Sequence, residues 1–122
     1  MTAHRIFATF ALLAVLGTAH ATRVLEQPER SYELSLSQLT LPSNAGGGLT
    51  VKACNDCAYT THVLSAGTQY FVNRQRVAFE DFSRIVGEVR ANRRALDTAI
   101  AGVYLDVDTG RVNRVALVYR NQ

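Results

Sequence analysis

Apolar and polar residues alternate in several short segments of the chain after residue 30. In the first of these segments, polar side chains separate the apolar positions Tyr32, Leu34, Leu36, Leu39 and Leu41. A period of two residues is typical of a strand with one buried face. Segments rich in β-branched and aromatic residues predict further strands over 49–53, 59–64 and 68–72, followed by a hairpin tip at 73–75.

After residue 78 the apolar positions recur with the period of an α-helix. One face carries Phe79, Phe82, Ile85, Val86 and Val89. The opposite face carries Glu80, Asp81, Arg84, Glu88 and Arg90. This division predicts an amphipathic helix whose apolar stripe is buried. Two alternating segments at 100–107 and 112–119, joined by a turn at 108–111, predict a β-hairpin.

These elements predict an α+β fold for residues 31–122, which we take as a single small domain. We expect a small antiparallel β-sheet with one amphipathic helix packed on it and a C-terminal β-hairpin. The hairpin at 100–119 is similar to those that close PepSY-type periplasmic modules, and we infer no function from it. The glycine run 46–48 lacks a following Lys-Ser/Thr pair, so it predicts a turn and not a phosphate loop.

The N-terminal residues 1–21 have the layout of a secretory signal peptide. His4 and Arg5 precede the apolar run 6–16, and Ala19-His20-Ala21 offers a cleavage site. As a helix this run would span about 16 Å, roughly half a bilayer core, so we do not expect an integral membrane protein after cleavage. A buried N-terminal helix is the alternative. The interpretation predicts a periplasmic or secreted protein, with residues 22–30 as a flexible leader.

The composition supports a folded domain and limits the classes of partner. Of the 122 residues, 48% are hydrophobic and 19% charged, which is enough apolar surface for one core. The 13 Lys and Arg against 10 Asp and Glu give a net charge of +3, and cleavage would remove Arg5 and leave +2. Such a small charge does not indicate nucleic acid or an anionic membrane as partner. We therefore expect a partner among envelope or periplasmic proteins.

The two cysteines, Cys54 and Cys57, enclose Asn55 and Asp56, which favour the centre of a β-turn. A β-turn holds its first and fourth Cα atoms within about 7 Å, and a disulfide needs them about 4.4–6.8 Å apart. Exported proteins with paired cysteines usually form disulfides. The spacing therefore predicts a local structural disulfide.

Two other interpretations of this cysteine pair stay open. The order strand, Cys-x-x-Cys, then β-α-β-β resembles part of a thioredoxin-like core, which implies a thiol-redox site. However, residues 58–64 are a poor helix, and no proline follows Pro42. The second alternative is a thiol-metal site in which His62 joins Cys54 and Cys57, although structural zinc prefers four ligands. A solvent-facing strand position is the simpler explanation of His62.

The remaining candidates for chemistry have simpler explanations. Asp106 and Asp108 resemble the start of a calcium loop, but Leu117 replaces its last ligand, and we expect a hairpin turn around Gly110. A hydrolytic triad would have to use His62, and the chain contains no Gly-x-Ser-x-Gly motif. The arginines Arg90, Arg93 and Arg94 would bind an anion or an acidic partner, or form a soluble helix end.

The sequence therefore predicts a non-catalytic binding or structural module without a cofactor. The alternative is the thiol-redox or thiol-metal module based on Cys54 and Cys57.

Overall fold

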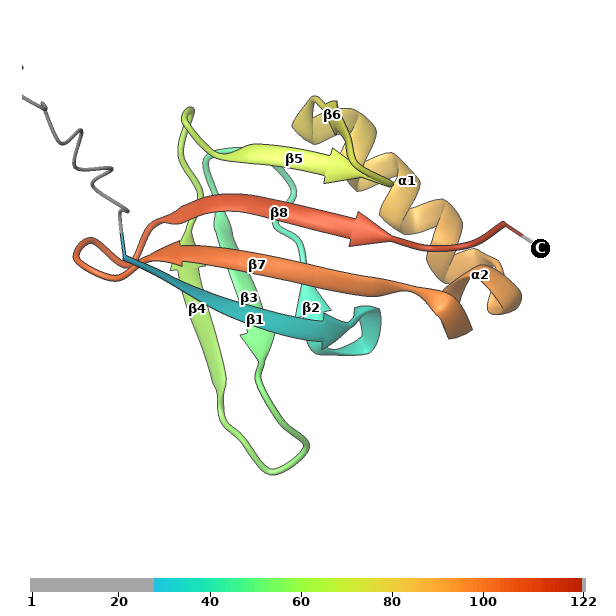
Figure 1. Ribbon diagram of the computed structural model, residues 1–122, viewed down its shortest axis with the longest axis horizontal. Helices are drawn as coiled ribbons and strands as arrows, with labels where there is room; N and C mark the ends of the chain where they lie inside the picture. Colours follow the sequence, from blue (N-terminus) through green and yellow to red (C-terminus); the bar gives the residue numbers. More distant parts are fainter. Residues whose placement is uncertain (1–27, 122) are drawn as a thin grey trace, which may run out of the picture.

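The computed structural model describes residues 28–121, and the predicted signal peptide and most of the predicted leader lie outside them. The larger of two sheets has the strand order β1-β7-β8-β5-β6 (Figure 1). Its strands are β1 (Glu29–Ser35), β7 (Ile100–Asp106), β8 (Val112–Val118), β5 (Gln69–Val72) and β6 (Gln75–Val77). Strands β5 and β8 pair in parallel, and the other neighbours pair antiparallel.

The smaller sheet is antiparallel and has the order β2-β3-β4. Its strands are β2 (Leu39–Thr40), β3 (Gly48–Lys52) and β4 (Tyr59–Val63). The helical segments are η1 (Leu36–Gln38), α1 (Phe79–Ala91) and α2 (Arg93–Thr98). Within residues 28–121, no helix has the length and apolar character needed to cross a bilayer.

The smaller sheet and α1 lie on the same side of the five-stranded sheet, behind it in the view of Figure 1. The apolar core occupies the space between these layers. It contains Leu34 of β1, Leu49 of β3, Phe82 of α1, Val103 of β7 and Val115 of β8, all at most 2% exposed. The predicted α+β fold, with a helix packed on antiparallel strands and a C-terminal hairpin, is confirmed, and within residues 28–121 the parallel pairing of β5 with β8 is the one departure from the antiparallel arrangement.

The sheet predicted as one is divided in two because the first predicted strand is interrupted by the 3-10 turn η1. At this point the Gln38 Oε1 atom accepts hydrogen bonds from the Ser35 backbone N–H and hydroxyl, at 3.0 and 3.2 Å. The chain then leaves the larger sheet and enters the smaller one, with Leu36 and Leu39 still buried. In addition, β1 begins at Glu29, two residues before the predicted start of the domain.

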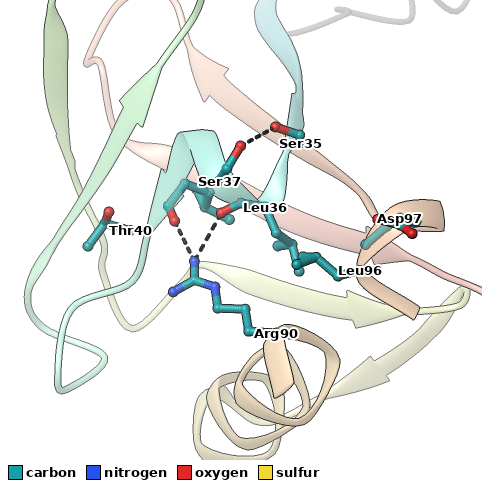
Figure 2. Close-up of a pocket in the computed structure, with 9 residues that line it drawn as sticks. Ser35, Leu36, Ser37, Thr40, Arg90, Leu96 and Asp97 are labelled. Atoms are coloured by element: carbon teal, nitrogen blue, oxygen red, sulfur yellow. Dashed lines mark hydrogen bonds between the residues drawn. The ribbon is translucent and has the colours of Figure 1, made fainter. Parts of the chain in front are cut away.

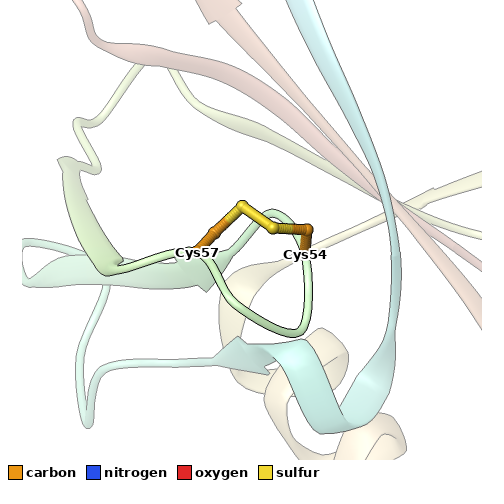
Figure 3. The surroundings of a disulfide bond; sticks show 2 residues. All are labelled: Cys54 and Cys57. Atoms are coloured by element: carbon orange, nitrogen blue, oxygen red, sulfur yellow. A yellow bond between two sulfur atoms is a disulfide. The ribbon is translucent and has the colours of Figure 1, made fainter.

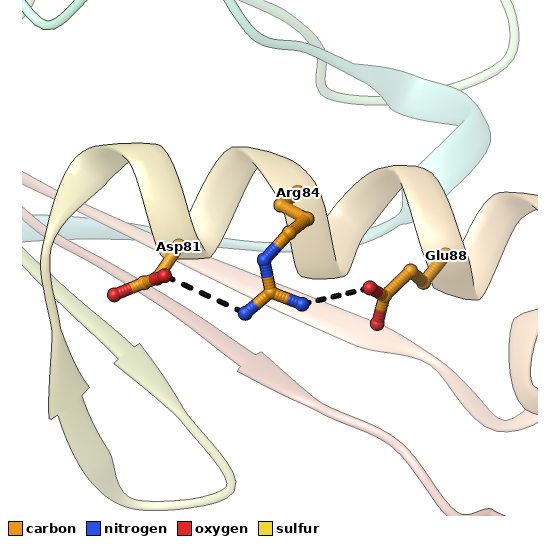
Figure 4. A network of polar contacts seen from close by, with 3 residues as sticks. All are labelled: Asp81, Arg84 and Glu88. Atoms are coloured by element: carbon orange, nitrogen blue, oxygen red, sulfur yellow. Dashed lines mark hydrogen bonds and ion pairs between the residues drawn. The ribbon is translucent and has the colours of Figure 1, made fainter.

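The helix α1 buries the predicted stripe, with one difference. Phe79, Phe82, Val86 and Val89 are buried, whereas Ile85 is half-buried at the border of the core. On the exposed face, Arg84 forms ion pairs with Glu88 at 2.7 Å and Asp81 at 3.5 Å (Figure 4). Exposed pairs at this spacing contribute only a few tenths of a kcal/mol each.

The sequence analysis did not predict the second helix. The side chain of Asn92 accepts hydrogen bonds from the backbone N–H groups of Arg94 and Ala95, at 3.1 and 3.3 Å. This is an N-terminal cap, so Arg93 and Arg94 begin α2 and do not extend the end of α1. Ala95 is fully buried and attaches the short helix to the core.

Candidate functional site

One exposed apolar surface is the outer face of the five-stranded sheet. We use this name for the side opposite α1 and the smaller sheet, which is turned toward the viewer in Figure 1. Its centre is formed by Phe71 of β5, Ile100 and Tyr104 of β7, and Ala116 and Val118 of β8. Ile100 and Val118 are 48% and 52% exposed. No element within residues 28–121 covers this face.

The Tyr104 ring is fixed in position at the middle of the outer face. A Cβ atom at Gly102 would lie 3.1 Å from the ring atom Cε2, so the absence of a side chain at Gly102 lets the ring lie back along its own strand without a shift of a few tenths of an ångström. The guanidinium carbon of Arg114 lies 4.0 Å from the ring centroid, a cation–π contact. Arg114 also pairs with Glu29 at 3.3 Å. The Tyr104 ring is therefore contacted by its own strand and by Arg114.

Apart from the Arg114–Glu29 pair, the charged groups of the outer face that we consider lie at its two margins. Glu33 lies at the margin formed by β1, whereas Arg74 and Arg76 lie at the margin formed by the β5–β6 hairpin. Within residues 28–121, these two arginines form no ion pair. The hairpin tip is held by Asn73, whose N–H donates to the Leu117 carbonyl at 2.8 Å. The basic margin is thus positioned against β8.

The second site is the cysteine pair, which lies at the end of the β3–β4 hairpin (Figure 3). Cys54 and Cys57 are joined, with their Cα atoms 4.9 Å apart, as the spacing predicts. The Cys57 N–H donates to the Cys54 carbonyl at 3.2 Å, which is the hydrogen bond of a β-turn. Cys54 is exposed and Cys57 half-buried, and the loop lies outside the core.

His62 is half-buried on β4, where the sequence predicted a solvent-facing position. Its ring packs against Tyr32 of β1 with the centroids 6.0 Å apart, and its Nε2 atom lies 3.2 Å from the Thr60 hydroxyl. Burial, followed by the positive charge of Arg30, lowers the pKa of His62. Among the described residues, no group of three or more His, Cys, Asp and Glu side chains is placed to hold a metal ion.

The two aspartates of the C-terminal hairpin have different environments. Asp106 is buried, and its Oδ1 atom accepts from the backbone N–H groups of Asp108 and Thr109 at 2.8 and 2.9 Å. The Thr109 N–H contributes most to lowering the pKa of Asp106. Asp108 is exposed. Gly110 has φ +69°, which a hairpin turn accommodates, so the structure supports the turn interpretation.

The predicted arginine cluster is divided by the break between α1 and α2. Arg93 and Arg94 are exposed on α2. Arg90 instead extends toward η1 and β2, where it lines an open cavity of about 580 Å³ (Figure 2). The cavity also contains Asp97 and several hydroxyl groups.

Compared with models of protein families, with curated proteins and with solved structures, the chain matches none. The site must therefore be interpreted from its own geometry. The sequence analysis missed both the outer face and the cavity. The sequence did contain an indication of the outer face. In segments 100–106 and 112–118, apolar residues occupy positions on both faces of the predicted strand, and not on one face only. Such a pattern is typical of strands that are buried on both faces.

Proposed function

We propose that the protein is an exported, non-catalytic binding module whose outer face binds an acidic surface of an envelope or periplasmic protein. The observation that carries this proposal is the exposed apolar centre of the outer face beside the unpaired Arg74 and Arg76. Exposed apolar patches with a polar margin commonly mark protein interaction sites.

Several features support export. The apolar run 6–16 follows His4 and Arg5 and precedes an Ala-x-Ala site, which is the layout of a signal peptide. The Cys54–Cys57 pair is compatible with an oxidising compartment.

The charges of the outer face favour an acidic protein as the partner. Arg76 on β6 and Arg74 in the adjacent turn would attract carboxylates, and neither has an ion pair to lose within residues 28–121. At the centre, Arg114 is already neutralised by Glu29, so it adds contact area more than net charge. Apolar contact would supply the affinity, whereas the two arginines would accelerate association and set the orientation.

The two candidate catalytic residues, Asp106 and His62, already interact with other groups of the chain, which supports a binding role. Asp106 is bound to its own turn, and the His62 ring packs on Tyr32. Both groups are thus engaged within the chain, whereas the outer face is built from side chains suited to contact.

The test requires a captured partner and a measured affinity. Mature protein immobilised through its C-terminus is exposed to envelope extract, the retained protein is purified, and its Kd is measured. We expect Val118→Asp to weaken binding about tenfold or more, because it places a carboxylate in the apolar centre. Arg76→Glu should also weaken binding, and its effect should decrease at high salt.

Matched controls separate the outer face from general surface changes. Val63, on β4, is 58% exposed, so Val63→Asp introduces the same charge at an equally exposed position on the smaller sheet. Arg93→Glu is the control for Arg76→Glu. The proposal fails if the control variants weaken binding as much as the outer-face variants, or if the captured protein is another copy of this chain.

A second candidate function is a thiol-redox or thiol-metal module, favoured by the exposure of Cys54 at the hairpin end. A small reductant or an oxidoreductase would reach this disulfide without opening the core. Insulin reduction that is abolished by Cys54→Ala would support redox activity. Thiols that are protected from alkylation until a chelator is added would support the metal site.

A further inference from the structure

The cavity beside Arg90 lies where two segments distant in sequence come together, residues 35–40 and 90–99. One wall is the end of β1 with η1 and β2, and the other is formed by the end of α1 with α2 (Figure 2). Its lining combines apolar side chains, hydroxyl groups and two opposite charges. The residues that matter here are Leu36, Ser37, Thr40, Arg90, Leu96 and Asp97.

The Arg90 guanidinium is held by neutral acceptors. Its Nη2 atom donates to the backbone carbonyl of Leu36 at 3.2 Å and to that of Leu39. Within residues 28–121, Arg90 forms no ion pair. A guanidinium has five N–H donors in a fixed planar arrangement. The carbonyls therefore orient the group, while its positive charge and the N–H donors on Nε and Nη1 stay available to a ligand.

A negative charge lies at another part of the same cavity. Figure 2 shows Asp97 separated from Arg90 by the side chains of Leu36 and Leu96. Within the described part of the chain, the Asp97 carboxylate accepts no hydrogen bond and forms no ion pair. The cavity thus presents a cation and an anion that do not neutralise each other, with an apolar surface between them.

We propose that this cavity binds a short zwitterionic peptide with apolar side chains. The C-terminal carboxylate would pair with Arg90, whose planar donors suit a carboxylate. The N-terminal ammonium group would pair with Asp97, and the apolar side chains would contact Leu36 and Leu96. The Thr40 hydroxyl lines the same cavity and would supply a further polar contact. This site is distinct from the outer face and does not depend on its function.

The test uses three dipeptide probes that differ in one charge each: Leu-Leu, N-acetyl-Leu-Leu and Leu-Leu-amide. Binding to the mature protein is measured by isothermal titration calorimetry, and the contacted residues are identified from NMR chemical-shift changes. Leu-Leu should bind at least about tenfold more tightly than either blocked probe, because each block removes one charged hydrogen bond. The shift changes should include Leu36, Leu96 and Asp97.

Variants separate ligand binding from a structural role of the same residues. Asp97→Asn should weaken Leu-Leu about tenfold and leave N-acetyl-Leu-Leu unchanged, since that probe has no amine. Arg90→Gln should weaken Leu-Leu and leave Leu-Leu-amide unchanged. Arg93→Gln, which removes a neighbouring charge outside the cavity, should change none of the three.

If Arg90→Gln unfolds the protein, the Asp97→Asn comparison alone decides the result. Equal binding of the three probes would overturn the proposal, as would the absence of binding to the folded wild-type protein. An equal loss for acetylated and free peptide in Asp97→Asn would also overturn it.

Discussion

The Thr68 hydroxyl donates a 2.7 Å hydrogen bond to the backbone carbonyl of Val112, 44 residues further along the chain. Thr68 is only 7% exposed, and its hydroxyl oxygen also accepts from the Ser65 N–H at 3.0 Å. This contact links the residue before β5 to the first residue of β8. It thereby helps to align the parallel pairing of these two strands.

Replacement of Thr68 by Val should destabilise the protein by about 1–3 kcal/mol. The variant keeps the shape of the side chain but leaves the buried Val112 carbonyl and the Ser65 N–H without their partner. Chemical denaturation measures the change in unfolding free energy. Thr61→Val is the control, because Thr61 is exposed and should cost less than about 0.5 kcal/mol. Equal losses in the two variants would show that the buried hydrogen bond is not important.

The buried face of α1 should dominate the contribution of this helix to stability. Phe82 is fully buried and packs against Tyr70 with the ring centroids 5.3 Å apart. We expect Phe82→Ala to cost about 3–5 kcal/mol through lost burial and the cavity left behind. Glu80→Ala, on the exposed face, should cost under about 0.5 kcal/mol. Similar thermal shifts for the two variants would contradict the packing of α1 described above.

The Asp106 carboxylate should make the stability of the hairpin depend on pH. The backbone N–H of Thr109, and secondarily that of Asp108, lower the pKa of Asp106, so folding favours the ionised form. Its contribution is therefore complete above the pKa of the unfolded chain, near 4, and is lost as the pH falls through the lower folded value.

The variant Asp106→Asn keeps an oxygen acceptor but cannot ionise. We expect it to be less stable than the wild type at pH 7 and to approach it as the pH falls below about 4. Urea denaturation across this range measures the difference. A difference that is constant with pH would show that the ionised form of Asp106 has no special role.

The Cys54–Cys57 disulfide should stabilise the hairpin end without being required for the fold. Because the closed loop is so short, its loss costs about 2 kcal/mol in the chain-entropy description. The double variant Cys54→Ala with Cys57→Ala should therefore melt at a lower temperature and keep the circular dichroism spectrum of the wild type. Loss of that spectrum at room temperature would mean that the turn is essential for folding.

Local periodicity predicted most elements of this fold, because α1 and strands such as β3, β7 and β8 bury side chains at regular intervals. The pattern could not show the division into two sheets, which depends on the contacts of Ser35 with Gln38. Nor could it show the six-residue helix α2, which depends on the Asn92 cap. Both interactions join residues that are close in sequence. The leucines before and after η1 continue to alternate with polar residues, however, so the pattern does not indicate the break at Ser35 and Gln38.

The candidate sites that depend on contacts between residues distant in the chain could not be predicted from the sequence. The Arg90 cavity requires a side chain to reach carbonyls 51 and 54 residues away, and the arginine run alone does not indicate this. The outer face requires β5 to pair with β8 so that Phe71 lies beside Ala116. The cysteine pair was predictable because its geometry is determined within four residues.

The central claim, that the outer face binds another exported protein, is tested most directly by photo-crosslinking in cells. A photoreactive residue is placed at Val118 on the outer face or at Val63 on the smaller sheet, two positions of similar exposure. We predict one main adduct with a different protein from position 118 and none from position 63. Equal adducts from both positions, or an adduct from position 118 with the mass of two copies of this chain, would contradict the claim.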